Sequence, residues 1–357
     1  MADPTPDPSG RVPRLKDIAR ESGYHITTVS LALREHPSIP EETRRRIREI
    51  AQRLGYQRNP VYYALSRFRQ QGTVRAPSPK IGYLENFGAG SGVARPAHLQ
   101  AILDGARRQA DVLGYQVDPI PVGEDDHDTR SLTSYLRDQQ IRGIIIGSFT
   151  PGRAEIALHW DDYATVKIHS RHTQPDVTVV GNDQLREVRE AFRRLSGLGY
   201  QRVGLVVGRA DEDGCGHRHT AGYLMEQADL PPDRRVPPLL FPYAITRDEL
   251  GAMIARWIRR HHVDGLLTNY GDIETMLAGA GVSVPQHVAC AHLCLCTPAE
   301  SNAAGIMPRL DVVGERAVSI VVTQMKSGEH GVPAFPSSIY VQSVWKDGES
   351  APSRGRR

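Results

Sequence analysis

Two short segments of the sequence concentrate cysteine and histidine, side chains that commonly bind transition metals. One runs from Cys215 to His219 and the other from Cys290 to Cys296. If the second segment were extended, its ends would lie roughly 20 Å apart at ~3.3 Å per residue, so it could not enclose an ion alone. A Zn²⁺ or similar ion would therefore need ligands from both segments. The alternative is that the cysteines are small apolar residues of a buried strand and that the histidines line a pocket.

Positive charge is concentrated near the N-terminus. Residues 11–75 contain 14 Lys and Arg against 6 Asp and Glu, a net charge of +8, whereas the whole chain carries +3. Contacts with the phosphates of a nucleic acid need such a concentration of basic side chains. A solvated helix face could account for Arg44, Arg45 and Arg46, but not for the contrast with the rest of the chain.

The elements that would position this charge are short helices. The spacing of apolar residues predicts helices over residues 16–22 and 25–33, separated by a turn at Gly23, where the missing Cβ removes a steric clash. A third helix is expected from Ile39 to Leu54, because Pro40 suits a first helical turn. Two short helices around a glycine turn predict a helix-turn-helix, whose second helix fits the DNA major groove.

A further short helix is expected after Asn59 and Pro60. Its apolar residues, at i, i+3, i+4 and i+7, are Val61, Ala64, Leu65 and Phe68. A helix of this length is marginal in isolation, so we expect it to form against a partner.

These motifs together resemble one protein family. They are Lys16-Asp17-Ile18-Ala19, Gly23, Thr28-Val29-Ser30, Thr43-Arg44, Leu54-Gly55-Tyr56 and Asn59-Pro60. The segment 14–69 that contains them resembles the LacI family of bacterial transcription regulators, in which a headpiece and hinge helix precede a domain like the periplasmic binding proteins. The resemblance implies double-stranded operator DNA and a small-molecule effector as partners, a homodimer, and no cofactor.

The resemblance also implies which residues contact DNA. Ile26, Thr27 and Leu31 take the positions that face base edges, where isoleucine and leucine can contact thymine methyl groups but cannot form hydrogen bonds. The alternative for Ile26 and Leu31 is packing in the core. Leu65 matches the hinge leucine that wedges into the minor groove and kinks the operator. The expected DNA contacts are Lys16, His25, Ile26, Thr27, Thr28, Ser30, Leu31, Arg34, Ser38, Asn59 and Leu65.

Strands and helices alternate over the rest of the chain, which predicts an α/β fold with doubly wound parallel sheets in two subdomains. The cleft between the subdomains is the expected pocket, because ligands of such sheets bind outside the carboxyl ends of the strands. We expect a disordered tail over residues 1–13, a helix-turn-helix headpiece over 14–58 and a hinge helix with linker over 59–79. An effector-binding and dimerisation domain of two subdomains is expected over 80–349, and a second disordered tail over 350–357.

The effector end matches the family less well. Sugar-responsive members place an arginine before a Gly-aromatic pair, whereas here His217 takes that position and Arg218 lies one residue away. Leu293 and Cys294 stand where those members have aspartates, so the charged side chains that grip sugar hydroxyls are largely missing. We therefore predict no sugar effector. The candidate effector-binding residues are Asn86, His169, Arg171, Asp183, His217, Arg218, Asn269, His292 and Leu293.

The sequence as a whole favours a sequence-specific DNA-binding regulator, expected to be a repressor, whose operator affinity is set by an effector bound between two subdomains. The alternative is a small-solute binding or sensing protein whose effector is not a sugar, a metal among the candidates. No GxSxG, Walker A or HExxH motif indicates an enzyme. Without a signal peptide or an apolar run of membrane-spanning length, we expect no membrane association and a location in the bacterial cytoplasm, at the nucleoid. The four cysteines are expected to be reduced there.

Overall fold

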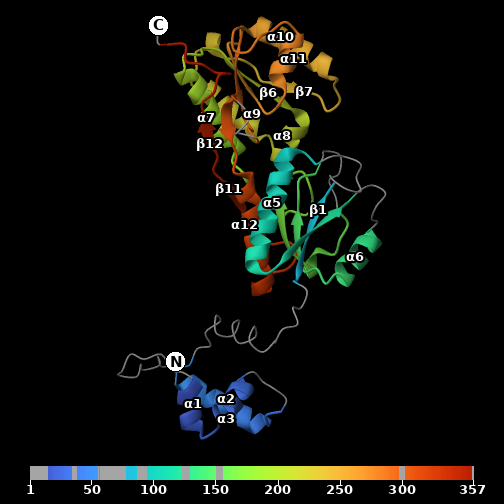
Figure 1. Ribbon diagram of the computed structural model, residues 1–357, viewed down its shortest axis with the longest axis vertical. Helices are drawn as coiled ribbons and strands as arrows, with labels where there is room; N and C mark the ends of the chain where they lie inside the picture. The colour runs from blue at the N-terminus through green and yellow to red at the C-terminus, as the bar shows by residue number, and fades with distance from the viewer. Residues whose placement is uncertain are drawn as a thin grey trace. The chain divides into compact units, whose positions relative to one another are not determined.

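The computed structural model describes residues 15–33, 38–54, 56, 78–86, 95–122, 129–149, 156–296 and 302–355. The chain divides into two compact units, Met1–Ala76 and Pro77–Arg357 (Figure 1). Three of the expected DNA contacts, Arg34, Asn59 and Leu65, lie outside the described residues, as does the expected hinge helix.

The first unit contains three described helices, α1 (Leu15–Ser22), α2 (Ile26–Leu33) and α3 (Glu41–Arg53). Gly23 makes the turn between α1 and α2 with a φ of 73°, a conformation that costs glycine little. The three helices share one small core, made by Ile18, Val29, Ala32, Ile47, Ile50 and Ala51. The predicted helix-turn-helix with a third helix behind it is confirmed.

The second unit contains two six-stranded sheets. The first has the strand order β11-β5-β4-β3-β1-β2, and each of its neighbouring strands runs parallel. Its strands are β1 (Lys80–Glu85), β2 (Gln116–Pro121), β3 (Gly143–Ile146), β4 (Ala164–Ile168), β5 (Thr178–Asn182) and β11 (Ser338–Val341). The helices associated with it are α5 (Ala97–Leu113), α6 (Thr129–Asp138) and α12 (Leu310–Ser327).

The second sheet has the order β12-β10-β9-β8-β6-β7, in which only the edge pair of β10 and β12 is antiparallel. Its strands are β6 (Val203–Gly208), β7 (Leu239–Phe241), β8 (Gly265–Thr268), β9 (Ala289–His292), β10 (Ala304–Met307) and β12 (Val344–Lys346). Its helices are α7 (Gln184–Gly197), α8 (Arg209–Cys215), α9 (Arg218–Ala228), α10 (Arg247–His261) and α11 (Ile273–Gly279). Together the two sheets confirm the predicted two-subdomain α/β fold.

Three described connections pass between the two sheets. They join β5 to α7, β10 to α12 and β11 to β12, and Figure 1 shows α12 alongside α5 on the first sheet. Each subdomain is therefore built from separate stretches of the chain.

The structure differs from the sequence prediction at the C-terminus, where we expected a disordered tail over residues 350–357. Ser350 is buried; its Oγ donates to the carbonyl of Cys290 at 2.7 Å and accepts from the amide of Ala304 at 2.8 Å. The Arg354 guanidinium lies 4.4 Å from the ring centroid of Tyr200. The small and polar composition of this segment suggested disorder, but its polar groups pair with strands β9 and β10. In the part of the chain that is described, no helix has the length and apolar character needed to span a membrane.

Candidate functional site

The first candidate site is the outer face of helix α2. Val29 and Ala32 face the three-helix core, whereas His25, Ile26 and Thr27 are exposed, with 42% of Ile26 accessible to solvent. Neither Ile26 nor Leu31 belongs to the core cluster or to the residues packed against it. The alternative of core packing for these two residues is therefore not supported.

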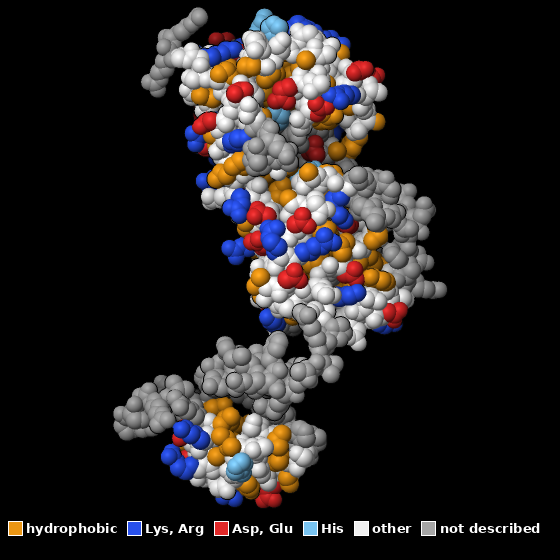
Figure 2. All heavy atoms as spheres, in the orientation of Figure 1, with side chains coloured by type: hydrophobic (Ala, Val, Ile, Leu, Met, Phe, Trp, Pro, Cys, Tyr) orange, Lys and Arg blue, Asp and Glu red, His pale blue; other side chains and the backbone are white. Residues whose placement is uncertain are grey.

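Two polar residues at the start of α2 are hydrogen-bonded to each other. His25 Nδ1 lies 3.1 Å from Thr27 Oγ1 and accepts from the Thr27 amide at 3.4 Å. Lys16 and Ser38 are exposed, and Thr28, Ser30 and Leu31 are half-buried. Figure 2 shows basic side chains at one edge of this unit. The start of α2 therefore presents both polar and apolar side chains to solvent.

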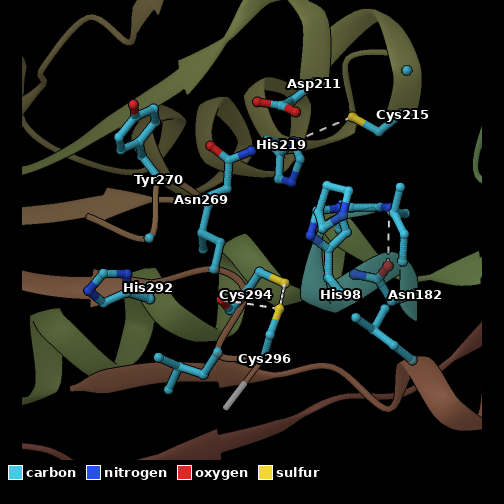
Figure 3. Close-up of a pocket in the computed structure, with 18 of the residues that line it drawn as sticks. His98, Asn182, Asp211, Cys215, His219, Asn269, Tyr270, His292, Cys294 and Cys296 are labelled. Carbon is cyan, nitrogen blue, oxygen red and sulfur yellow. Dashed lines mark hydrogen bonds between the residues drawn. The ribbon is translucent and has the colours of Figure 1, made fainter. Parts of the chain in front are cut away.

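The second candidate site is a cavity of about 1050 Å³ in the second unit. Residues that follow the carboxyl ends of strands line it from both sheets, including His169 after β4, Asn269 after β8, and Leu293 after β9. Figure 3 shows the side chains of His98, Asn182, Asn269, His292 and others gathered around this space. The pocket therefore lies where parallel sheets generally bind ligands.

The structure divides the candidate effector residues into two sets. His169, Asn269, His292 and Leu293 line the cavity. The other five are absent from its described lining: Asn86, Arg171, Asp183, His217 and Arg218.

Three of these outlying residues meet beside the connections between subdomains. Arg218 Nη2 donates to Asp183 Oδ1 at 2.6 Å, and its guanidinium lies 4.4 Å from the ring centroid of Tyr340 on β11. Arg171 donates to the hydroxyl of Tyr340 and, at 3.1 Å, to Ser338 Oγ. Because Arg218 lies in one subdomain and Tyr340 in the other, the contact between them ties the two subdomains together.

A buried carboxyl group also occupies this junction. Asn182 Nδ2 donates to Glu187 Oε2 at 2.5 Å, and the hydroxyl of Ser343, between β11 and β12, donates to the other oxygen. Burial raises the pKa of Glu187 to about 7, although Ser343, His219 and Asn182 favour its charged form. Two of the three connections thus converge on one protonatable group.

This burial predicts a specific pH dependence of stability. Because the pKa of Glu187 is higher in the folded chain than in the unfolded chain, the folded chain binds more protons between about pH 4.5 and pH 7, and stability falls as pH rises through that window. Across this window, we expect the free energy of unfolding of wild type to fall by up to about 3 kcal/mol relative to that of Glu187→Gln. Denaturant titrations at pH 5 and pH 7.5 measure it. Glu190→Gln on the same helix is the control, and equal pH dependence of all three proteins would contradict the prediction.

Two groups of side chains that could hold a metal ion lie at or beside the pocket. In the first, Glu212 Oε1 lies 2.7 Å from His219 Nδ1, and Cys215 Sγ lies 3.4 Å from the same nitrogen. Burial alone would lower the pKa of His219, but the hydrogen bonds to Cys215 and Glu212 raise it to about 10. Burial opposes the charge on Glu212, yet hydrogen bonding with His219 lowers its pKa to about 2.

The second group joins α11 to the end of β9. His292 Nε2 lies 2.7 Å from Glu274 Oε1 and 3.9 Å from Cys290 Sγ, and burial raises the pKa of the Cys290 thiol. Cys294 and Cys296 lie apart from this group, with their sulfur atoms 3.1 Å from each other.

The expectation that one ion would take ligands from both cysteine- and histidine-containing segments is therefore wrong. Residues of the first segment lie beside Glu212, and residues of the second lie beside Glu274. Sequence reasoning missed both glutamates. Glu212 had a usable signal, since it precedes Cys215 by three residues and such residues share a helix face. Glu274 had none, because α11 and β9 meet only through the tertiary fold.

Two family models match the chain. Residues 14–59 match the model of bacterial regulatory proteins of the lacI family, and residues 95–230 match that of the periplasmic binding proteins and sugar binding domain of the LacI family.

Curated relatives match part of the chain. An uncharacterized HTH-type transcriptional regulator in the aml 5′ region of Streptomyces limosus is 29% identical over 58% of this chain and 56% of its own length. Catabolite control protein B of Bacillus subtilis is 24% identical over 55% of this chain and 58% of its own. The chain thus spans little more than half the length of these relatives.

Solved structures share the fold at low sequence identity. A complex of the transcriptional regulator CelR with cellobiose has a TM-score of 0.55 at 18% identity, covering 95% of this chain and 99% of its own. The lac repressor dimer bound to operator and an anti-inducer has a TM-score of 0.53 at 14% identity, covering 96% of this chain and 100% of its own. With its helix-turn-helix unit, its two-sheet unit and both family models matched in order, the chain belongs to the LacI family of bacterial regulatory proteins.

Proposed function

We propose that this protein is a transcriptional repressor that binds a specific operator as a homodimer and releases or engages it according to a small molecule held in the pocket. The observation that carries the proposal is the exposed face of α2, which presents Ile26 and Thr27 to solvent while its other face completes the headpiece core. The similarity to regulators, one of them solved as a dimer on its operator, supports the same reading.

In the proposed complex, α2 lies in the major groove. Ile26 contacts a thymine methyl group, and the hydrogen-bonded pair of His25 and Thr27 supplies the polar contact to a base edge. Leu31 faces base edges beside Ile26, and Lys16, Thr28, Ser30, Arg34 and Ser38 contact phosphates. Asn59 and Leu65 act at the hinge, where Leu65 enters the minor groove.

The pocket gives the proposal its regulatory part. A ligand that contacts both subdomains stabilises one relative arrangement of them, and the two arrangements would differ in operator affinity. The lining contains histidine, asparagine and cysteine, with Asp211, Glu274 and Glu349 as acids. This set differs from the arginine and aspartate grips of sugar-responsive relatives, so the proposed effector is not a sugar.

The DNA-binding part is tested through Lys16, which is exposed. Lys16→Ala is expected to weaken binding about uniformly across sequences and to reduce the slope of log affinity against log salt by about 1, as for the loss of one phosphate contact. Fluorescence anisotropy with a duplex selected by the wild-type chain measures both quantities. Lys326→Ala, which removes an exposed charge at the end of α12, is the control. An equal effect of the two variants would contradict the assignment.

A further inference from the structure

We propose that Glu212, Cys215 and His219 form a binding site for a divalent transition metal ion, Zn²⁺ or a chemically similar ion, in the wall of the pocket. This deepens the proposed function, on which it rests for its regulatory role, by naming the class of ligand that the pocket takes. Binding of the ion itself depends on these three side chains and not on DNA.

The spacing of the three donor atoms fits a tetrahedral ion. With Zn–S near 2.3 Å and Zn–N and Zn–O near 2.0–2.2 Å, a tetrahedral site separates sulfur from nitrogen or oxygen by about 3.5–3.6 Å and nitrogen from oxygen by about 3.4 Å. Cys215 Sγ lies 3.4 Å from His219 Nδ1 and 3.6 Å from Glu212 Oε1. The third separation, 2.7 Å, is that of a hydrogen bond and would need to open by about 0.7 Å to admit the ion. All ligand atoms lie within 4.8 Å of one another.

The local backbone brings these donors together. Helix α8 ends at Cys215, and Gly216 and His217 follow with φ values of 70° and 58°, which turns the chain so that α9 begins beside α8. The Thr220 amide donates to Glu212 Oε2 at 3.0 Å. This bond orients the carboxylate and leaves Oε1 directed at the other two donors, as supporting hydrogen bonds commonly do around metal ligands.

Convergence on one nitrogen distinguishes this group from a catalytic arrangement. In a Cys–His–carboxylate triad the thiol and the carboxylate occupy opposite ring nitrogens. Here both approach Nδ1, so the three donors surround one point, where a cation fits in place of a proton. Cys215 and His219 also line the pocket (Figure 3), which lets a water molecule or an external ligand complete the coordination.

The group formed by Glu274, Cys290 and His292 fits an ion less well. Its Cys290 Sγ to His292 Nε2 separation is 3.9 Å, longer than a tetrahedral edge, and Cys290 is not among the described residues of the pocket lining. Cys290 is therefore the matched control for Cys215.

The test is a titration of the full chain with Co²⁺, after removal of metal by a chelator and without DNA. We expect one Co²⁺ per chain, a near-ultraviolet band from thiolate-to-cobalt charge transfer, and displacement of Co²⁺ by Zn²⁺. Cys215→Ser should abolish the band and Cys290→Ser should retain it, while His219→Gln should raise the Kd for Co²⁺ at least about tenfold. Absence of the band in wild type, its survival in Cys215→Ser, or its loss only in Cys290→Ser would overturn the proposal.

X-ray absorption of the wild-type zinc complex provides a measurement that needs no variant. One sulfur and otherwise nitrogen or oxygen ligands are expected, whereas no sulfur, or two or more, would contradict the site. Because neither experiment contains DNA, failure to bind metal leaves the operator proposal standing, and failure to bind an operator leaves the metal site standing.

Discussion

Replacing Ile47 with alanine is expected to abolish operator binding without changing the melting temperature of the second unit. Ile47 is fully buried in the core shared by α1, α2 and α3. Loss of a buried isoleucine side chain to alanine costs about 2–5 kcal/mol, which is comparable to the whole stability of a domain this small. Since the second unit is a separate compact body, its own unfolding should be unaffected. Anisotropy with a selected duplex and differential scanning calorimetry measure the two effects.

The reciprocal variant is Ile81→Ala. Ile81 is equally buried, in β1 of the second unit, so the same change should lower the melting temperature of that unit. Ile47→Ala protein that retained wild-type affinity for DNA would contradict the role assigned to the headpiece. A lowered melting temperature of the second unit in Ile47→Ala would contradict the independence of the two units.

Gly314→Ala is expected to destabilise the second unit by about 3 kcal/mol or more. A Cβ at residue 314 would lie 2.0 Å from the carbonyl oxygen of Ile102, and one at Gly105 would lie 2.0 Å from that of Asp311. Helices α5 and α12 therefore approach through facing glycines, and neither backbone can yield without separating the helices. Guanidinium titration of the full chain, followed in the second unit, measures the effect.

Gly197→Ala is the matched control, because residue 197 lies in α7 and nothing is within 4 Å of an added Cβ there. Alanine in a helix with open space should be neutral or stabilise by about 0.4–1 kcal/mol. If Gly314→Ala and Gly197→Ala had the same effect, the close packing of α5 against α12 would not be a determinant of stability.

Sequence patterns predicted those elements that are defined by residues close to each other in the chain. The glycine turn and apolar spacing identified the three headpiece helices, and apolar runs identified the central strands of both sheets. Strands β7, β10, β11 and β12 and helix α8 were not predicted. β11 pairs with β5, more than 150 residues earlier, and short half-exposed strands of this kind carry little periodicity.

Part of the candidate pocket could also be predicted from the sequence. His169, Asn269 and His292 follow from the rule that ligands bind at the carboxyl ends of parallel strands. Arg171 was assigned to the pocket because it follows the strand over residues 164–168, and Arg218 through the family resemblance. Both instead contact Tyr340 on the unpredicted strand β11, at the junction between subdomains.

The proposed function depends on sequence-specific binding of DNA by the first unit. It can be tested by selecting duplexes from a random-sequence pool with the purified full chain and measuring their affinity at several salt concentrations. We predict enrichment of a two-fold-symmetric sequence that is bound more tightly than a scrambled duplex of the same composition, with affinity that falls steeply as salt rises. Recovery of no preferred sequence, with equal and weak binding to every duplex, would contradict the claim.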